Sequence, residues 1–508
     1  MKDLKNYCLP AALLLGGLYP AYAGKDAPNI VLILADDMGY GDVSYYNPMS
    51  RIRTSNLDRM ASESAVYMDA HSSSSVSSPT RYGILTGRYN WRSTMKRSVL
   101  NGYSKALIPQ DRETMASMLR KQGYNTAAIG KWHLGWDWNN IEAGNENVDF
   151  SKPIANGPTS LGFDYFYGFC GSLDMAPYVY VENDMPTAVP DRKTVNKGKY
   201  SWWREGPTSP DFHHEDVLPN IIDRGCRYIL ENAKSRKPYF LYLPLPAPHT
   251  PILPSEEFRG KSGIGEYGDY VLMVDAMVGR VLDAVKRSGE DKNTIIIFVT
   301  DNGCSPAAGI PEMEEQGHYP SYIYRGHKAD LYDGGHRIPC IVRWKAKVKP
   351  HRVSQTVCLT DFYATFAAIN HYALSDSEGE DSYNLLPTLL SVEEVPTIRE
   401  ATVHHSIQGE FTIRQGKWKL LLSASSGGWS EPRPEKKEIL KDLPPMQLYD
   451  MYGDPEELQN LVDVYPEKVK ELKDLLLKYI DEGRSTPGKP QKNDEVKSWV
   501  QLETIRNL

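Results

Sequence analysis

Four continuous apolar runs recur along the first part of the chain, and each is followed by polar residues of the kinds that hold ligands. The runs cover residues 29–34, 126–130, 239–243 and 294–299, and the polar residues after them are Asp36 and Asp37, Lys131 and His133, His249, and Asp301 and Asn302. Short apolar runs that end at turn residues are typical of buried β-strands. Helical segments separate them, which predicts a large, mostly parallel, doubly wound α/β sheet flanked by helices. Because ligands of such sheets bind at the carboxyl ends of the strands, we expect the polar residues to share one site.

Two helical patterns support this plan. The first is predicted over about 113–122, and the second, over about 267–287, carries apolar residues at helical spacing that should pack against the sheet.

Between residues 138 and 250 the composition shifts to Gly, Pro, Asn and aromatic residues, including Trp202 and Trp203. Such stretches are usually long loops, which here are expected to wall a pocket.

A smaller C-terminal α+β subdomain is expected over 386–508, after a stretch rich in Ser, Asp, Glu and Gly. The strand-like segments 401–405, 411–414 and 417–422 predict an antiparallel sheet. Residues 466–481 carry apolar side chains on one face of a predicted helix. The last residues, 485–508, are polar and are expected to be held only weakly.

Composition restricts the function classes. The chain has 508 residues, 41% of them hydrophobic and 24% charged, as in an ordinary globular protein. Its net charge of -7 argues against a nucleic-acid surface, which needs a basic excess. An anionic substrate must therefore be held by local positive charge and not by the field of the whole protein.

The N-terminus has the pattern of a cleavable signal peptide over residues 1–23. Lys2 and Lys5 precede an apolar run from 9 to 18, and Ala21-Tyr22-Ala23 resembles a cleavage site, with the cut expected after Ala23. The run is shorter than the about 20 residues of a membrane span. A secreted or periplasmic protein with no membrane span is expected.

Cysteine usage does not indicate a disulfide scaffold or a zinc ribbon. Cleavage after Ala23 would leave five cysteines, an odd number without a C-x-x-C pair: Cys170, Cys226, Cys304, Cys340 and Cys358. Most are expected to be buried thiols, with one or two bridges at most.

A serine cluster broken by Pro79 precedes a short predicted helix. If the helix begins at Pro79, a favoured first position, Arg81 lies one turn beyond Ser77. A serine hydroxyl and a guanidinium at a helix N-terminus are suited to an anion. For so short a motif, a solvated serine-rich loop that caps the helix is the commoner explanation.

A longer pattern resembles the signature of the sulfatase family. Ser77-Ser78-Pro79-Thr80-Arg81, followed by Ile84-Leu85-Thr86-Gly87, matches its order of residues. The resemblance implies an alkaline-phosphatase-like fold, with a catalytic domain over 24–385. It also implies that Ser77 is oxidised to formylglycine (3-oxoalanine), the modified residue of this family.

The four polar residues after the first and last apolar runs are oxygen ligands. A hard divalent cation would suit this set of ligands, which are Asp36, Asp37, Asp301 and Asn302. Ca²⁺ is preferred to Zn²⁺ as the bound metal, and Mg²⁺ is an alternative. Taken singly, the first pair could be a helix N-cap and the second a turn. In the family that the chain resembles, both pairs bind one Ca²⁺ together with the formylglycine, here at Ser77.

Further basic residues match the family pattern. Lys131-Trp132-His133-Leu134-Gly135 is similar to its Lys-Trp-His element, Pro248-His249-Thr250-Pro251 to its histidine loop, and Lys328 to the lysine before its Gly-Gly turn. By composition alone, His133 beside Trp132 is more often a packed histidine. The resemblance implies that Arg81 and Lys131 bind the sulfate, His133 and Asp301 accept protons, and His249 or Lys328 protonates the leaving alcohol.

The resemblance also bears on maturation and substrate. Because position 77 is serine, it implies the oxygen-independent radical maturating enzyme of bacteria as a partner. The substrate implied is a sulfated oligosaccharide, in particular 6-O-sulfated N-acetylgalactosamine or galactose of a glycosaminoglycan-type glycan. Asp174 and His405 are candidate readers of sugar hydroxyls. Two alternatives stay open: a phosphodiesterase or phosphonate monoester hydrolase of the same superfamily, and a non-catalytic glycan binder if Ser77 is unmodified.

Overall fold

The computed structural model describes residues 26–140 and 147–508 of the chain. The predicted signal peptide, residues 1–23, and its cleavage after Ala23 lie outside the described residues. The predicted boundary between residues 385 and 386 is not tested by the architecture and stays a prediction.

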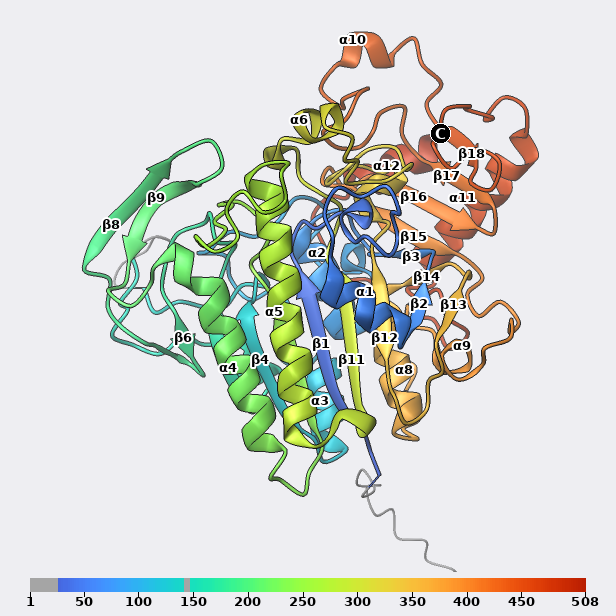
Figure 1. Cartoon of the computed structure of the whole chain (residues 1–508). Helices are drawn as coiled ribbons and strands as arrows, with labels where there is room; N and C mark the ends of the chain where they lie inside the picture. Colours follow the sequence, from blue (N-terminus) through green and yellow to red (C-terminus); the bar gives the residue numbers. More distant parts are fainter. Residues whose placement is uncertain (1–25, 141–146) are drawn as a thin grey trace, which may run out of the picture.

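A ten-stranded mixed sheet forms the centre of the molecule (Figure 1), in the order β13-β2-β12-β11-β1-β10-β4-β5-β6-β7. Its strands are β1 (Asn29–Ala35), β2 (Ala65–Tyr67), β4 (Asn125–Lys131), β5 (Tyr165–Phe169), β6 (Val181–Glu182), β7 (Met185–Pro186), β10 (Tyr239–Pro244), β11 (Thr294–Thr300), β12 (Cys340–Arg343) and β13 (His351–Val353). The five strands β11, β1, β10, β4 and β5 are parallel, and β12 pairs antiparallel with β11 and β2. The predicted fold class and the four predicted strands are confirmed.

Helices cover both faces of this sheet, which explains why its strands are continuously apolar. Val31 and Ile33 of β1 point into a core with α1 (Ser55–Ser62), α4 (Val217–Asn232) and α5 (Glu266–Ser288). Ile30 and Leu32 point into a second core with α2 (Ser77–Thr86), α3 (Met115–Lys121) and α8 (Phe362–Ile369). In Figure 1, α4 and α5 lie in front of the sheet. The alternation along one strand thus builds both cores.

The C-terminal part forms a four-stranded antiparallel sheet with a helix packed on it. The strands are β15 (Thr402–His405), β16 (Phe411–Gln415), β17 (Trp418–Leu421) and β18 (Gln447–Asp450), and the helix is α11 (Pro466–Asp481). Ile413 and Leu420 of the sheet share a core with Leu472 and Leu476 of the helix. The antiparallel sheet and its helix are confirmed, but β18 was not predicted, because only its pairing with β17 extends this short segment.

The expectation that residues 485–508 are weakly held is wrong. They include α12 (Val500–Asn507), in which Ile505 is buried. Trp499 packs near Trp91 and Phe411, with ring centroids 6.2 and 6.1 Å apart. These apolar contacts anchor the segment together with polar ones, such as the hydrogen bond from Asp494 N to Arg92 O at 2.7 Å.

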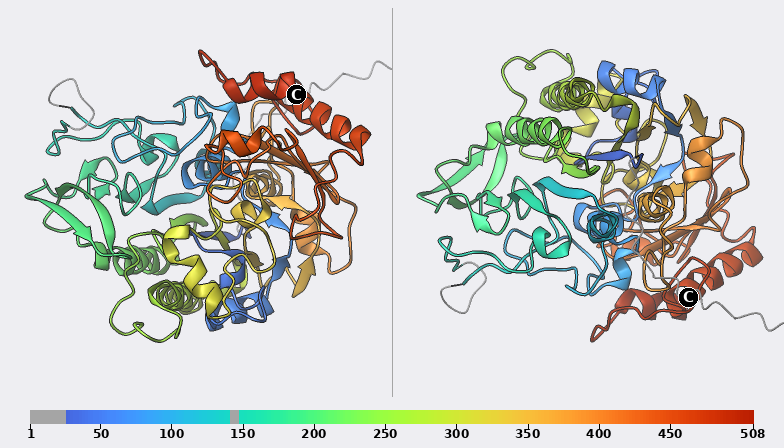
Figure 2. Two further views of the ribbon diagram at one scale, coloured as in Figure 1. Left: turned by 90° about the horizontal axis from the view of Figure 1, so that it is seen from above. Right: turned by 90° about the horizontal axis from the view of Figure 1, so that it is seen from below.

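The remaining strands and helices are short. They are β3 (Ala70–His71), β8 (Arg192–Lys197), β9 (Trp202–Thr208), β14 (Val357–Cys358), α6 (Ile310–Glu315), α7 (Asp333–His336), α9 (Leu386–Leu390) and α10 (Lys437–Leu440). Strands β8 and β9 form a hairpin that lies on the opposite side of the molecule from the C-terminal sheet (Figure 2).

Two expectations from composition can be compared with the structure. All five cysteines of the described chain are free thiols, and four of them are buried. In residues 26–140 and 147–508, no helix is both long and apolar enough to cross a bilayer.

Candidate active site

The polar residues that follow the parallel strands meet at one edge of the sheet. Asp36 follows β1, Asp301 follows β11, Lys131 ends β4 and His249 follows β10. The backbone N–H of Asp301 donates to Ala35 O at 3.1 Å, which sets the two acidic segments side by side. Parallel neighbours in a sheet bring their carboxyl ends together, and this is why residues far apart in the chain become one cluster.

Ser77 lies at the centre of this cluster. Its hydroxyl donates to Asp301 Oδ2 at 2.6 Å and lies 3.1 Å from Asp36 Oδ1, and the residue is 2% exposed. Helix α2 begins at Ser77 itself, two residues before the expected start at Pro79, because the backbone is extended only as far as Val76. The hydroxyl oxygen of Ser77 is therefore held at the N-terminus of helix α2, between the carboxylates of Asp36 and Asp301.

Two buried cations lie against the same carboxylates. Lys131 Nζ is 2.6 Å from Asp36 Oδ2 and 3.4 Å from Ser77 Oγ. Arg81 donates to Asp301 Oδ2 at 2.9 Å and lies 3.6 Å from Asp36, while its Nε has no partner among the described residues. Burial by itself would raise the pKa of Asp36, but the positive charges of Lys131, His249 and Arg81 lower it to about 2. The unpaired, buried N–H of Arg81 is suited to an anionic ligand.

The second acidic residue, Asp37, connects the cluster to the outer part of the site. Lys328 Nζ is 2.7 Å from Asp37, and His249 Nε2 is 3.6 Å from it. Three carboxylates, those of Asp36, Asp37 and Asp301, are thus balanced by three cations, those of Arg81, Lys131 and Lys328. A bound divalent cation would make the cluster net positive, which suits a sulfate ester.

The donor set fits a hard divalent cation. Asn302 Nδ2 donates to Asp37 Oδ1 at 2.8 Å, which leaves the buried Asn302 Oδ1 with no partner among the described residues. Asp36, Asp37 and His249 also offer ligand atoms that lie within 4.8 Å of one another. An unpaired amide oxygen beside three carboxylates is the kind of oxygen site that Ca²⁺ prefers.

His133 has the tautomer that a proton acceptor needs. Its Nε2 donates to Leu100 O at 2.7 Å, and its buried Nδ1 has no partner among the described residues. Burial lowers the pKa of His133 well below its ordinary value, and the charges of Lys131 and Arg81 lower it further. Its φ of 55° is in the left-handed region, a strain that is common at functional sites. A neutral imidazole with a free lone pair results.

Ser172 contacts both Lys131 and His249, two basic residues that belong to different sequence motifs. Its Oγ is 3.1 Å from Lys131 Nζ and 3.3 Å from His249 Nδ1. The segment Gly171-Ser172-Leu173-Asp174 was singled out for Asp174 alone. A serine in a glycine-containing loop has no signal in sequence that would have separated it from an ordinary turn residue.

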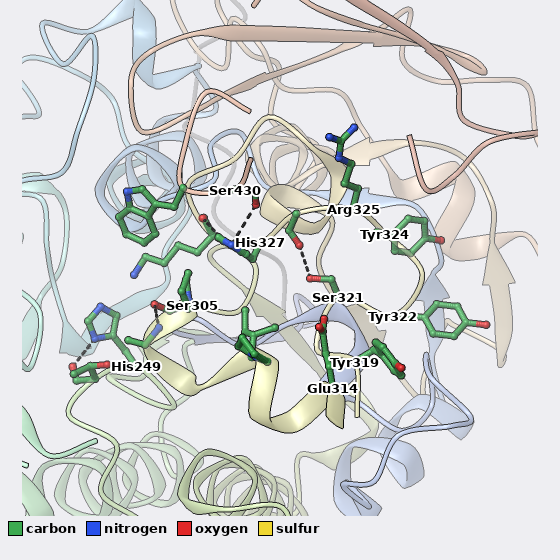
Figure 3. A pocket seen from close by; sticks show the side chains of 18 of the residues that line it. His249, Ser305, Glu314, Tyr319, Ser321, Tyr322, Tyr324, Arg325, His327 and Ser430 are labelled. Carbon is green, nitrogen blue, oxygen red and sulfur yellow. Dashed lines mark hydrogen bonds between the residues drawn. The ribbon is translucent and has the colours of Figure 1, made fainter. Parts of the chain in front are cut away.

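A cavity of about 870 Å³ opens beside the cluster. His249, Lys328 and Asp174 line it, together with aromatic residues: Trp202, Tyr319, Tyr322, Tyr324 and Trp429. Figure 3 shows His249 on one side of the cavity, and Tyr319, Tyr322 and Tyr324 on the other. Since His249 and Lys328 also contact Asp37, the cavity leads directly to the buried cluster.

The two candidate hydroxyl readers have different environments. Asp174 lines the cavity, its Oδ2 accepts from Arg204 at 2.7 Å, and its buried Oδ1 has no partner among the described residues. His405 is instead 1% exposed on β15, where Asn90 Nδ2 donates to its Nδ1 at 2.9 Å, and it is not among the cavity-lining residues. The structure brings Asp174 to the cavity and leaves His405 in the C-terminal core; the role of each stays a prediction.

Burial of His405 is expected to make stability depend on pH. Burial lowers its pKa from 6.5 to about 3, so between these values the unfolded chain binds a proton that the folded chain does not. The free energy of unfolding should therefore fall by about 1.4 kcal/mol per pH unit from this residue as the pH falls below 6.5. In His405→Asn, whose amide oxygen can still accept from Asn90, urea unfolding at several pH values should show a slope smaller by that amount. An unchanged slope would mean that His405 is protonated in the folded protein.

Comparison with known proteins agrees with this geometry. A family model described as Sulfatase matches residues 28–371. An N-acetylgalactosamine-6-O-sulfatase of Bacteroides thetaiotaomicron is 32% identical over 489 residues, covering 88% of this chain and 92% of its own length. Arylsulfatase A of Homo sapiens is 30% identical over 489 residues, covering 92% of this chain and 90% of its own. A solved structure from work on the metabolism of multiple glycosaminoglycans by Bacteroides thetaiotaomicron superposes with a TM-score of 0.78 at 31% identity, covering 89% of this chain and 99% of that chain. The chain therefore belongs to the sulfatase family and is a sulfuric ester hydrolase.

Proposed function

We propose that this protein removes the 6-O-sulfate of N-acetylgalactosamine or galactose in a glycosaminoglycan-type glycan. The observation that carries the proposal is the position of Ser77, between two carboxylates and two buried cations beside a cavity with aromatic walls. Similarity to the N-acetylgalactosamine-6-O-sulfatase of Bacteroides thetaiotaomicron supports this substrate class. Tyrosine and tryptophan walls offer apolar surfaces with polar edges, which suits sugar rings.

We further propose that position 77 acts as formylglycine and that one Ca²⁺ binds beside it. Hydrated formylglycine supplies a carbon with two hydroxyl groups, so that a sulfated form need not be a dead end as an ordinary serine ester would be. Asp36, Asp37, Asp301 and Asn302 would hold the cation, which supplies positive charge next to the transferred sulfate.

The remaining roles follow from position. Arg81 and Lys131, buried next to Ser77 Oγ, would bind sulfate oxygens and stabilise developing negative charge. Asp301 Oδ2 accepts from the Ser77 hydroxyl and would take its proton, while Nδ1 of His133 would be the base for the later step. His249 and Lys328 line the cavity, and one of them would protonate the sugar oxygen that leaves.

The test is sulfate release together with mass spectrometry. Native protein, produced with the radical maturating enzyme that the serine at position 77 implies, is given sulfated mono- and disaccharides. We expect free sulfate from 6-sulfated galactose-configured sugars and a peptide lighter by two hydrogens at Ser77. Turnover of phosphodiesters without sulfate release would favour a phosphodiesterase, and an unmodified Ser77 without turnover would favour a glycan binder.

We also propose export to the periplasm or the medium, on the basis of the N-terminal pattern of Lys2, the apolar run and Ala23. N-terminal sequencing of the protein recovered from the periplasm should begin at Gly24. Recovery with Met1 intact would contradict the proposal.

A further inference from the structure

The β8–β9 hairpin carries a local excess of positive charge beside the cavity. Between Asp191 and Glu205 there are five basic residues and these two acidic ones, in a chain whose net charge is -7. The hairpin projects from the body of the protein in Figure 1. A concentration of cations on one element of an acidic protein indicates a local site for an anion.

The strand register decides which side chains of the hairpin belong to the cavity side. Trp202 is 39% exposed and lines the cavity. Lys197 pairs directly with Trp202 across the two strands, and residues directly opposite each other point to the same face. Arg204, two residues along β9, points to that face as well, with its guanidinium 5.1 Å from the ring centroid of Trp202. Lys193 lies on the same face of β8 as Lys197, but it is four residues, about 13 Å, farther along the strand from Trp202.

Contacts at the tip and at the base of the β8–β9 hairpin hold it against the rest of the protein. At the tip, Lys199 pairs with Glu312 of α6 at 2.7 Å, and Ile252 N donates to Tyr200 O at 2.6 Å. At the base, Tyr178 N donates to Pro207 O at 2.8 Å. Helix α6 contributes cavity-lining residues as well, so the hairpin tip is attached to another wall of the same cavity.

Arg204 links the hairpin to the part of the cavity next to the catalytic cluster. Its guanidinium pairs with Asp174 Oδ2 at 2.7 Å, and Asp174 lines the cavity together with His249. The guanidinium remains half exposed, so it has donors available beyond this pair. Trp202, which lines the cavity, thus shares one face of the hairpin with two cations, Lys197 and Arg204.

We propose that Trp202, Arg204 and Lys197 form a subsite for a second, anionic sugar, linked to the sugar that loses its sulfate. The proposal rests on the proposed glycan sulfatase function and extends it: the preferred substrate carries a carboxylate or a further sulfate on the neighbouring residue. Trp202 contacts the face of that sugar, and Lys197 and Arg204 bind its anionic group.

The test compares three disaccharides with the sulfated monosaccharide. The disaccharides share the 6-sulfated sugar and differ in its neighbour, which is a uronate, a sulfated hexose or a neutral hexose. For the wild type, kcat/KM from sulfate release should be higher for an anionic neighbour than for the neutral one, and this preference should shrink as salt is added. The first two disaccharides distinguish a carboxylate site from a sulfate site. Equal kcat/KM for anionic and neutral neighbours would overturn the proposal.

Matched charge reversals at the two ends of β8 locate the effect. In Lys197→Glu, the preference for an anionic neighbour should fall about three- to tenfold, whereas Lys193→Glu, four residues farther along the strand from Trp202, should keep it. Trp202→Ala should lower kcat/KM for every disaccharide, relative to the monosaccharide, by about threefold or more. Equal losses of preference in the two lysine variants would reject a defined subsite in favour of general charge attraction.

Binding measurements separate this proposal from the proposed function. The desulfated acidic disaccharide is titrated calorimetrically into wild type, Lys197→Glu and Lys193→Glu. Affinity about three- to tenfold weaker in Lys197→Glu alone would support the subsite even if no substrate released sulfate. Unchanged affinity in Lys197→Glu, or no binding to the wild type, would overturn it even if sulfate release were observed.

Discussion

Replacing Ser77 with alanine is expected to lower kcat for sulfate release by about 10⁵-fold or more while the protein stays folded. Removal of a reacting side chain costs a rate factor of this order, because the remaining groups have no atom to act on. Ser77 Oγ is the side-chain atom that contacts Asp36, Asp301 and Lys131 together. The alanine variant also lacks the oxygen from which the proposed formylglycine would be made. Steady-state sulfate release and circular dichroism provide the measurement.

Ser73→Ala is the matched control for this variant. Ser73 belongs to the same serine-rich stretch and is equally buried, but its Oγ has no hydrogen-bond partner among the described residues. Its loss should leave kcat close to that of the wild type. If Ser77→Ala retained more than a small fraction of the wild-type rate, Ser77 would not be the reacting residue.

Replacing Lys131 with alanine is expected to reduce both activity and stability. Its ammonium group lies 2.6 Å from Asp36 and within 3.4 Å of Ser77 Oγ, so its loss removes a cation at the reacting position. We expect kcat/KM to fall about 10³-fold, as when one group that stabilises transition-state charge is removed. Removal of one partner of a buried ion pair also costs about 3–5 kcal/mol, because Asp36 would be left buried and without this cation.

Lys419→Ala separates the two effects of this substitution. Lys419 is equally buried and pairs with Asp333 and Glu457, away from Ser77. Its removal should cost similar stability, but kcat per folded molecule should be retained. Calcium should raise the melting temperature of Lys131→Ala more than that of Lys419→Ala, because a cation near Asp36 offsets the missing charge only in the first. Equal calcium effects in the two variants would contradict calcium binding beside Asp36.

The fold class could be predicted because its signals are local. The strands β1 and β11 are apolar throughout, since helices cover both faces of the sheet, and helix α11 has the predicted bounds because one face is apolar along its whole length. The general rule that parallel strands align their carboxyl ends was then sufficient to predict that Asp36 and Asp301 would meet.

Contacts between distant segments had no local signal and depended on the tertiary structure. Strand β18 exists through its pairing with β17, and α12 is held through Trp499 and Ile505. Ser172 became part of the site because its loop passes between Lys131 and His249. His405, a candidate reader of sugar hydroxyls, is buried because β15 packs against the segment that contains Asn90.

The sequence by itself determined which residues could do chemistry and at which edge of the sheet most of them would gather. That information resides in residue type and in the periodicity of apolar positions, both of which are local properties. Only the tertiary structure decided which nitrogen of His133 is free, that the side-chain oxygen of Asn302 is unpaired, and that Lys197 and not Lys193 lies opposite Trp202. These features depend on pairing partners that are remote in the chain or on the register of a hairpin, and no local pattern of residues specifies either.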